Sequence, residues 1–280
     1  MAQKVIVITG ASDGIGRAAA RRLHADGHEV VVVGRSPQKT RSLADELGVE
    51  HHVADFADLA SARSLAADLV ARHPRIDVLA NNAGGIFGRQ RAVTVDGHEM
   101  TFQVDYLAPF LLTQHLMPTL VASKATVINT SSLANRIFSR FDLDDLESER
   151  RYRPIRAYGN AKLAQVLFTK ELERRYGAEG VTSTAFHPGA IATNFSVDEG
   201  TGMAGLYRWR LRDLVMQSPE QGASTLVFLA EGEPGVDYPT GLYYTRSRPA
   251  RASRLADDAD LARDLWDRSV AMLEAAPAGR

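Results

Sequence analysis

Short apolar runs alternate along this chain with longer segments in which apolar residues recur at helical spacing. The runs are rich in Val and Ile, and Gly, Asn or Asp bounds most of them. Such runs are typical of strands that are buried on both faces of a parallel sheet. We expect seven strands, at residues 4–9, 29–34, 49–54, 76–81, 126–130, 181–186 and 241–244. The pattern predicts an α/β fold with one doubly wound Rossmann-type sheet and helices on both faces.

Two intervening segments show the apolar stripe of a core-facing helix. One carries Leu59, Leu65 and Leu69, and the other carries Met100, Val104, Leu107, Leu111, Leu112 and Leu116. Two further segments interrupt the alternation: residues 138–153, which are dense in Asp, Glu and Arg, and residues 194–218, which delay the helix after the sixth strand. Because loops at the carboxyl ends of parallel strands build binding sites in such folds, we expect both segments to border a site.

Composition favours one domain and excludes several classes of protein. The 280 residues carry a formal net charge of -1 with both signs interspersed, so we expect no basic face for nucleic acid. The chain has no Cys and its eight His show no metal-ligand spacing, so we expect no metal site. No signal-like N-terminus is present, and no apolar run approaches the roughly 20 residues that span a membrane. We therefore expect a single cytoplasmic domain over residues 1–280.

A glycine-rich loop follows the first predicted strand and opens the first predicted helix. Glycine there lets backbone amides approach a pyrophosphate, whose charge the helix N-terminus favours. Taken alone, the loop is equally compatible with a plain strand-to-helix turn. Its place near the N-terminus, where a Rossmann fold has its phosphate loop, favours a dinucleotide. The residues concerned are Thr9, Gly10, Ala11, Ser12, Asp13, Gly14, Ile15 and Gly16.

The end of the second predicted strand indicates which dinucleotide binds. An acidic residue there would bind the ribose hydroxyls of NAD, but the chain has Gly34 followed by Arg35. Because a guanidinium binds a 2′-phosphate with two hydrogen bonds, NADP(H) is favoured over NAD(H), and an acidic residue at position 34 is expected to reverse the preference. NAD stays open as the alternative, since Arg35 also suits a solvated loop and Asp13 adds a negative charge to the glycine loop.

Two further turns complete the expected cofactor site. Asp55 and Phe56 follow the third predicted strand, where Asp55 is placed either to bind the adenine amine or to cap the helix that starts near Asp58. A turn of two amides and two small residues closes the fourth predicted strand and suits the close approach of a cofactor. Its residues are Asn81, Asn82, Ala83 and Gly84.

Tyr158 and Lys162 lie four residues apart at the start of a predicted helix, so their side chains share one face. The pKa of free tyrosine is about 10, too high for a base at neutral pH, and a nearby positive charge favours the phenolate. Lys162 supplies one such charge, and an oxidised nicotinamide supplies another when bound. The pair is therefore a candidate for proton exchange, although many ordinary helices carry the same spacing.

Taken in order, the glycine loop, the turn at residues 81–84, Ser132 and the Tyr158/Lys162 pair resemble the short-chain dehydrogenase/reductase family. The resemblance covers nearly the whole chain. It implies that Ser132 donates a hydrogen bond to the substrate oxygen, Tyr158 exchanges the proton and Lys162 holds the nicotinamide ribose. It also implies a turn after the sixth strand that holds the nicotinamide carboxamide, with Pro188, Gly189, Ile191 and Thr193.

Three stretches are similar to the retinol dehydrogenase and WW-domain oxidoreductase branch of that family: TVDGHEM at residues 94–100, RAYGNAKLA at residues 156–164 and GLYY at residues 241–244. The long charged insertion between Ser132 and Tyr158 is similar to that branch as well. Many members of the branch have no assigned substrate, so this likeness does not point to retinol.

One position departs from the family pattern. Asp105 stands where the family usually has an asparagine, to which a water that relays protons to the lysine is attributed. An ionised aspartate accepts hydrogen bonds but donates none. We place Asp105 with the catalytic residues, as the member of the proton relay that the resemblance supports least.

These residues predict an NADP(H)-dependent oxidoreductase that moves a hydride between the nicotinamide and an alcohol or carbonyl carbon. His187, which precedes a proline turn, is expected to be structural rather than a base. A non-catalytic NADP-binding sensor or scaffold is the alternative. Asp105 keeps that alternative open, whereas the retention of Ser132, Tyr158 and Lys162 argues against it.

The expected lid at residues 194–218 bears on substrate and partners. An apolar stripe on a mobile lid favours a hydrophobic small-molecule alcohol or carbonyl substrate, whereas a stripe packed on the sheet or against a second copy of the chain would not. A homo-oligomer therefore stays open. Arg208, Arg210 and Arg212 would also suit peripheral contact with an anionic membrane surface. The stripe consists of Met203, Leu206, Tyr207, Leu211, Leu214 and Val215.

Overall fold

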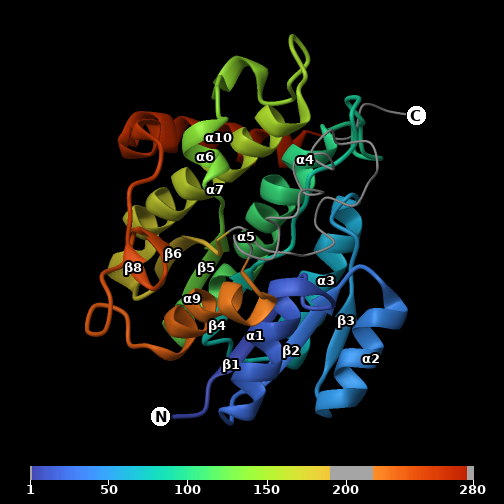
Figure 1. Cartoon of the computed structure of the whole chain (residues 1–280), viewed down its shortest axis with the longest axis vertical. Helices are drawn as coiled ribbons and strands as arrows, with labels where there is room; N and C mark the ends of the chain where they lie inside the picture. The colour runs from blue at the N-terminus through green and yellow to red at the C-terminus, as the bar shows by residue number, and fades with distance from the viewer. Residues whose placement is uncertain (1, 190–216, 276–280) are drawn as a thin grey trace.

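A twisted sheet runs through the middle of the molecule, and helices cover both of its faces (Figure 1). This computed structural model describes residues 2–189 and 217–275. Within these residues the strands follow one another across the sheet in the order β3-β2-β1-β4-β5-β6-β7-β8, and the last pair is antiparallel. The α/β class and the doubly wound sheet are confirmed. The strands are β1 Val5–Thr9, β2 Glu29–Gly34, β3 His51–Val53, β4 Val78–Asn81, β5 Thr126–Thr130, β6 Thr182–His187, β7 Tyr243–Thr245 and β8 Arg248–Pro249.

The short edge strand β8 was not predicted; the sequence indicated seven strands. It pairs with β7 through a two-residue turn, Arg246 and Ser247, whose φ angles are 50° and 57°. Positive φ at both positions is the geometry of a type I′ hairpin, which Asn-Gly usually marks. Because Arg-Ser carries no such signal, the sequence pattern did not reveal this hairpin.

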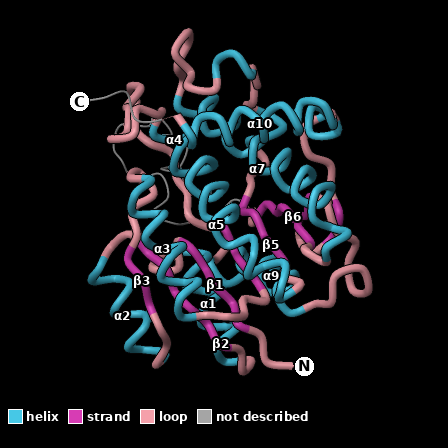
Figure 2. Tube along the Cα trace, turned by 180° about the vertical axis from the view of Figure 1, so that it is seen from behind, coloured by secondary structure: helices cyan, strands magenta, loops and turns pink. Residues whose placement is uncertain are grey.

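The two faces of the sheet carry separate apolar cores, because successive residues of a strand point to opposite sides. Val30 and Val32 of β2 join the core shared with α1, α2 and α9, whereas Val31 and Val33 join the core shared with α3, α5 and α7. The layers can be followed from the other side in Figure 2. The helices are α1 Gly14–Ala25, α2 Pro37–Leu47, α3 Leu59–Arg72, α4 Met100–Phe102, α5 Ala108–Ser123, α6 Ala134–Ile137, α7 Pro154–Tyr176, α9 Pro219–Glu231 and α10 Ala259–Glu274.

Side-chain caps fix where several helices begin. Ser36, Asp58 and Ser218 accept hydrogen bonds from the first turns of α2, α3 and α9. Pro37 and Pro219 occupy the first helical positions of α2 and α9, where the missing amide hydrogen costs nothing. Short 3₁₀ turns complete the regular structure, at Leu143–Asp145, Gly177–Glu179 and Arg254–Asp257.

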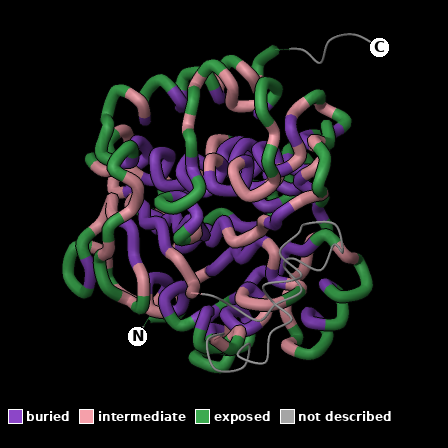
Figure 3. Tube along the Cα trace, turned by 45° about the horizontal axis from the view of Figure 1, so that its top comes forward, coloured by how far each residue is buried: buried purple, intermediate pink, exposed green. Residues whose placement is uncertain are grey.

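Burial follows the layers, with the strands and the inner faces of the helices buried and the connecting loops exposed (Figure 3). The carboxyl ends of the parallel strands β1, β4 and β5 lie along one edge of the sheet, and the segments that follow them carry the candidate site. No helix in residues 2–189 and 217–275 is long and apolar enough to cross a membrane. The expected lid lies outside the described residues, apart from Gln217 and Ser218.

Candidate active site

The glycine loop after β1 packs directly against the turn after β4. Gly10 has a φ of 65°, and a Cβ there would lie 2.8 Å from the Cα of Ala83. A Cβ on Gly16 would collide with the carbonyl of Gly10 and lie 2.7 Å from Asn82 Nδ2. Both positions need glycine because the two segments are in backbone contact. The fold thus joins two motifs that the sequence shows only as separate turns.

Thr9 fixes the turn after β4. Its Oγ1 accepts hydrogen bonds from the amides of Asn82 (2.9 Å) and Ala83 (3.0 Å). The same hydroxyl donates to the carbonyl of Ala80 (3.2 Å). Thr9 therefore acts on the cofactor site by holding this turn against β1.

Asn81 turns its side chain into the interior. Its Nδ2 donates to Thr113 Oγ1 on α5 (3.1 Å) and to Asn129 Oδ1 on β5 (3.0 Å). These bonds tie β4 to α5 and β5, so the Asn81 amide nitrogen is used within the fold. Contact between Asn81 and a cofactor stays a prediction.

The N-terminus of α1 opens from the glycine loop and suits an anion. Asp13 caps the helix by accepting a hydrogen bond from the amide of Gly14 (2.8 Å), and Gly14 has a φ of 52°. The first turn of α1 contains no acidic residue. Ile15 packs into the core and orients this turn. Backbone amides at a helix N-terminus bind phosphate groups, so these residues fit the pyrophosphate of a dinucleotide.

Lys39 counters the negative charge of the glycine loop. Its Nζ lies 2.8 Å from Asp13 Oδ2, and both side chains are exposed. Lys39 belongs to the first turn of α2, four residues after Arg35, which is exposed at the end of β2. Lys39 was not among the predicted site residues, because nothing in the spacing of residues 13 and 39 signals that they meet. Lys39 therefore offsets the negative charge of Asp13, which in the sequence alone argued against a bound 2′-phosphate.

Gly34 leaves no room for a side chain. A Cβ there would collide with Thr40 Oγ1 and lie 2.8 Å from the Cβ and Oγ of Ser12. Thr40 cannot easily give way, because its hydroxyl donates to the carbonyl of Ser36 (2.6 Å). The expectation that an acidic residue at position 34 simply reverses the cofactor preference is corrected, since that residue would also distort the glycine loop and α2.

Asp58 rather than Asp55 caps α3, with its Oδ1 accepting from the amide of Ala60 (2.9 Å). Asp55 is exposed after β3 and accepts from the amide of Ala57 (3.0 Å) in the preceding turn. Phe56 is buried in the core, so it offers a cofactor no more than backbone atoms. Contact between Asp55 and an adenine amine stays a prediction.

Tyr158 and Lys162 share one face of α7, as their spacing predicts. The Lys162 Nζ lies 5.4 Å from the centroid of the Tyr158 ring. Tyr158 is 7% exposed and packs against Ile86 and Ala134. The Lys162 ammonium donates to the carbonyl of Thr130 at the end of β5 (3.2 Å). The phenol thus lies close to a positive charge in a largely apolar surrounding.

Ser132 follows β5 and stands at the entry to α6, which packs on α7. It is partly exposed, and its Oγ accepts from the amide of Ala134 (3.2 Å). Its neighbour Ser131 is buried and donates to the carbonyl of Lys162 (2.7 Å). Ser131 therefore braces α7 from inside, while the hydroxyl of Ser132 lies on the accessible side.

Asp105 stands in a π-helical turn, Gln103–Leu107, between α4 and α5. Pro109 has no amide hydrogen, so the Asp105 carbonyl lacks its α-helical donor. Gln165 Nε2 of α7 donates to that carbonyl instead (2.6 Å). The apolar stripe of this segment predicted an ordinary helix, and the π turn is a feature that the stripe did not reveal.

Asp105 and Lys162 form a buried ion pair. Asp105 Oδ2 lies 3.0 Å from Lys162 Nζ, and their side chains are 0% and 2% exposed. Asp105 Oδ1 accepts from the amide of Gly85 (2.7 Å). A Cβ on Gly84 would lie 2.9 Å from both charged groups, so glycine is required there. The contact is direct, whereas the family pattern suggested a water between the two positions.

Each charge of this pair depends on the other. Burial raises the pKa of Asp105, while the Lys162 ammonium and the Gly85 amide oppose that rise. Removing a carboxylate and an ammonium from water costs several kcal/mol per ion, and only close pairing with further hydrogen bonds offsets this cost. The pair thus holds Lys162 beneath the tyrosine ring.

The segment after β6 is described in part. Gly189, next to Pro188, has a φ of 96°, whereas Ile191 and Thr193 lie outside the described residues. His187 Nδ1 is buried and has no hydrogen-bond partner among the described residues, and burial lowers the pKa of this imidazole to about 4. A neutral His187 agrees with the structural rather than basic part expected for it.

The sequence matches one family over most of its length. A model of the short chain dehydrogenase family spans residues 4–203. The chain belongs to the short-chain dehydrogenase family. It therefore belongs to a family of oxidoreductases that bind a nicotinamide cofactor and act on alcohol or carbonyl groups, as the turn and helix motifs implied.

Curated relatives agree with this assignment. The "Putative daunorubicin C-13 ketoreductase DnrU" of Streptomyces sp. (strain C5) is 37% identical over 275 residues, which cover 96% of this chain and 92% of that protein. Retinol dehydrogenase 13 of Homo sapiens is 36% identical over 286 residues, which cover 96% of this chain and 84% of that protein. The likeness to the retinol dehydrogenase branch is confirmed.

Solved structures share the fold of this short-chain dehydrogenase. An uncharacterised protein from Mycobacterium paratuberculosis superposes with a TM-score of 0.77 at 31% identity, over 97% of this chain and 93% of that one. A structure described as a "putative NAD(P) dependent gluconate 5-dehydrogenase" from Beutenbergia cavernae, with NADP bound at low occupancy, has a TM-score of 0.64 at 26% identity, over 82% and 90% of the two chains.

The buried pair generates a stability prediction. We expect Asp105→Leu to lower the free energy of unfolding by about 3–5 kcal/mol, because it strands the Lys162 ammonium in the interior. Asp105→Asn should cost less, since an amide oxygen can still accept from Gly85. Urea unfolding followed by circular dichroism measures both. The exposed Arg268–Asp144 pair provides the control, and Asp144→Asn should change little. An Asp105→Leu variant as stable as the unmodified chain would contradict the coupling.

Proposed function

We propose that this short-chain dehydrogenase is an NADP(H)-dependent oxidoreductase that interconverts an alcohol and a carbonyl on a hydrophobic small molecule. The observation that carries the proposal is the buried Asp105–Lys162 pair beside the Tyr158 ring, next to a glycine loop that suits a pyrophosphate. A lysine held at 2% exposure beside a phenol and paired with a buried carboxylate is more than binding a nucleotide ribose requires. Burying that charge costs free energy, which favours a role for Lys162 in the reaction.

Tyr158 is assigned as the group that exchanges a proton with the substrate oxygen. The positive charge of Lys162 stabilises the phenolate that forms when the phenol gives up its proton. When bound, a nicotinamide dinucleotide supplies the hydride acceptor or donor. Lys162 is also placed to hold the nicotinamide ribose. Stabilising the phenolate and holding the ribose are compatible roles for Lys162, because both require its ammonium to be fixed between the cofactor and the phenol.

Ser132 is assigned as the hydrogen-bond donor to the substrate oxygen. It lies on the accessible side of the β5–α6 turn, and Ser131 and Asn135 hold that turn from within. A fixed hydroxyl near a developing oxyanion lowers the barrier without reorganising during the reaction. The turn is therefore well placed to orient a carbonyl toward Tyr158.

Asp105 is assigned as a positioning residue that acts through Lys162. Its carboxylate fixes the ammonium on one side while the Thr130 carbonyl accepts from it on another. The same negative charge offsets part of the pull that Lys162 exerts on the phenol. With Asp105 in place of the family's usual neutral amide, Lys162 is held more rigidly but favours the Tyr158 phenolate less strongly.

The preference for NADP(H) rests on the charge around the end of β2. Arg35 is exposed there, Lys39 lies in the first turn of α2, and Ser12 contacts Gly34. The N-terminus of α2 adds a favourable dipole for a phosphate. A related fold that holds NADP supports the same preference.

A hydrophobic substrate is favoured by the surface that follows Ser132. Leu133, Ile137 and Phe138 are 43%, 50% and 43% exposed along α6, beside the assigned hydrogen-bond donor. Exposed apolar side chains next to a catalytic group favour apolar ligands. A relative that is named a daunorubicin ketoreductase and others named retinol dehydrogenases support the same class.

The function is tested by removing the transferable proton. We expect Tyr158→Phe to lower turnover by at least the roughly 10²–10⁴-fold that general acid–base catalysis contributes, while NADPH still binds. NADPH oxidation is followed across a panel of aldehydes, ketones, quinones and steroids, and NADPH affinity by fluorescence. The control is Tyr152→Phe, because that phenol donates to the carbonyl of Phe87 (2.9 Å) and is assigned no part in the reaction.

Either of two results would count against this function. Normal turnover of Tyr158→Phe would remove Tyr158 from the mechanism. Tight NADPH binding by the unmodified chain with no oxidation on any member of the panel would favour the sensor or scaffold alternative.

The charge of Asp105 gives a prediction about pH. Asp105→Asn removes a negative charge that offsets the Lys162 ammonium, so proton loss from the phenol becomes easier. In the direction of alcohol oxidation the rate rises with pH as the base forms, and this rising limb should move to lower pH. NADPH affinity should hardly change. If the rising limb of the pH–rate profile stays in place in Asp105→Asn while thermal stability falls, the role of Asp105 is structural alone.

Cofactor preference is tested at Arg35. We expect Arg35→Ala to weaken NADPH binding about 10–100-fold, the worth of one or two charge-assisted hydrogen bonds, and to leave NADH binding unchanged. Fluorescence titration with each dinucleotide measures both. Arg41→Ala, which changes an exposed arginine on α2, is the matched control. Equal affinity of the unmodified chain for NADPH and NADH would sink the preference.

A further inference from the structure

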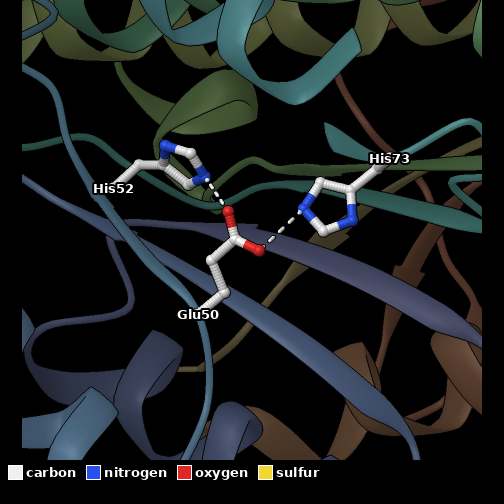
Figure 4. Close-up of side chains that lie close together, drawn as sticks. All are labelled: Glu50, His52 and His73. Atoms are coloured by element: carbon white, nitrogen blue, oxygen red, sulfur yellow. Dashed lines mark hydrogen bonds and ion pairs between the residues drawn. The ribbon is translucent and has the colours of Figure 1, made fainter. Parts of the chain in front are cut away.

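Two imidazoles and one carboxylate meet at the β3 edge of the sheet (Figure 4). Glu50 lies between the two rings and directs one oxygen to each of them. Its Oε1 lies 3.0 Å from His52 Nε2, and its Oε2 lies 3.4 Å from His73 Nε2. All three donor groups lie within 4.8 Å of one another.

The fold, and not the sequence spacing, assembles this cluster. Glu50 precedes β3, and His52 pairs with Val33, which places its side chain on the face that α3 covers. His73 is the C-cap of α3, its amide donating to the carbonyl of Leu69 (2.8 Å). The cluster therefore joins the edge strand to the end of the helix above it. No motif of metal-ligand spacing reports it, because His73 is distant in sequence.

His73 supplies the observation that points to a ligand. The residue is 6% exposed, and its buried Nε2 makes no hydrogen bond in the described part of the chain, where its contact is the ion pair with Glu50 Oε2 at 3.4 Å. That nitrogen faces Glu50 and His52. Glu29 Oε1 lies 4.0 Å from the other ring nitrogen, Nδ1. A carboxylate on the far side of a histidine is a frequent arrangement behind metal ligands, where it orients the ring.

We propose that Glu50, His52 and His73 bind a divalent ion of the zinc class, with water as a fourth ligand. Imidazole nitrogen and carboxylate oxygen are ligands that Zn²⁺ prefers, and two nitrogens disfavour Mg²⁺. A tetrahedral ion with bonds of about 2.0–2.1 Å holds its ligand atoms roughly 3.3–3.4 Å apart. The His73–Glu50 distance of 3.4 Å equals that separation, the His52–Glu50 distance of 3.0 Å is slightly shorter, and all ligand atoms lie within 4.8 Å of one another, so side-chain rotations could bring them around an ion.

Binding would fasten the edge of the sheet. β3 has three residues and, within the described part of the chain, pairs with β2 alone, so its own hydrogen bonds hold it weakly. An ion shared by the β3 and α3 side chains would link that strand to the helix layer. The catalytic Ser132 would be unaffected directly, since β2, β1 and β4 separate β3 from β5, which corresponds to roughly 19 Å at 4.8 Å per strand.

The exposed Arg72 competes with an ion for the same carboxylate. Its Nη1 lies 3.6 Å from Glu50 Oε1, and its side chain is 65% exposed. An arginine so placed can swing into solvent when a metal binds. Removing the charge of Arg72 therefore distinguishes a metal site from a cluster of ion pairs. Without this cation Glu50 would bind a metal ion more tightly, whereas a cluster held by ion pairs would become less stable.

The test is zinc binding by the whole chain purified without a histidine tag. Isothermal titration with ZnCl₂ should show one saturable site, and thermal unfolding should shift upward with Zn²⁺ but not with Mg²⁺. His52→Gln, His73→Gln and Glu50→Gln should each weaken binding by more than the 10–100-fold that residues hydrogen-bonded to metal ligands contribute. Co²⁺ should give the intense visible absorption of a tetrahedral site.

Two variants serve as matched controls. His51→Gln changes the adjacent histidine, which pairs with Val32 and points to the other face of the sheet, and should bind Zn²⁺ as the unmodified chain does. Arg72→Gln should bind Zn²⁺ more tightly and stay folded. The proposal is overturned if the unmodified chain shows no saturable site, if His52→Gln and His73→Gln bind Zn²⁺ normally, or if Arg72→Gln binds more weakly.

Discussion

A lysine ammonium buried beside an aspartate carboxylate is the interaction on which the rest of this site depends. Neither charge tolerates the interior alone, because each has lost its water. The surrounding structure meets that demand in several ways: Gly84 leaves space, the Gly85 amide donates to Asp105, and the Thr130 carbonyl accepts from Lys162. The ion pair therefore links the ends of β4 and β5 to the π-helical turn and to α7.

The π-helical turn is the backbone feature that makes this pairing possible. Pro109 prevents an ordinary continuation of hydrogen bonds from Asp105, and Gln165 supplies a donor from α7. The helix that carries Asp105 and the helix that carries Lys162 are thus joined twice, through a side chain and through a carbonyl. π turns are rare and cluster at functional sites, and this one positions a charged residue that the family usually replaces by an amide.

The parallel sheet explains why distant segments converge here. β1, β4 and β5 end at one edge, so strand direction alone brings together the glycine loop, the turn at residues 81–84 and Ser132. Gly84 lies at the junction, next to the glycine loop through Ala83 and next to the charged pair itself. The same topology places the Glu50 cluster at the β3 edge of the sheet, where among the described residues β3 pairs with β2 alone and the C-terminal end of α3 lies close by.

The sequence by itself determined the fold class, the bounds of β1 to β7 to within two residues, the glycine loop and the shared face of Tyr158 and Lys162, because these depend on local periodicity and spacing. It identified Asp105 as unusual but not its partner atom. Tertiary structure alone decided the direct Asp105–Lys162 contact, the Lys39–Asp13 pair, the crowding at Gly34 and the Glu50 cluster. Each of these joins residues from different elements, and only the packing of those elements sets the distances between them.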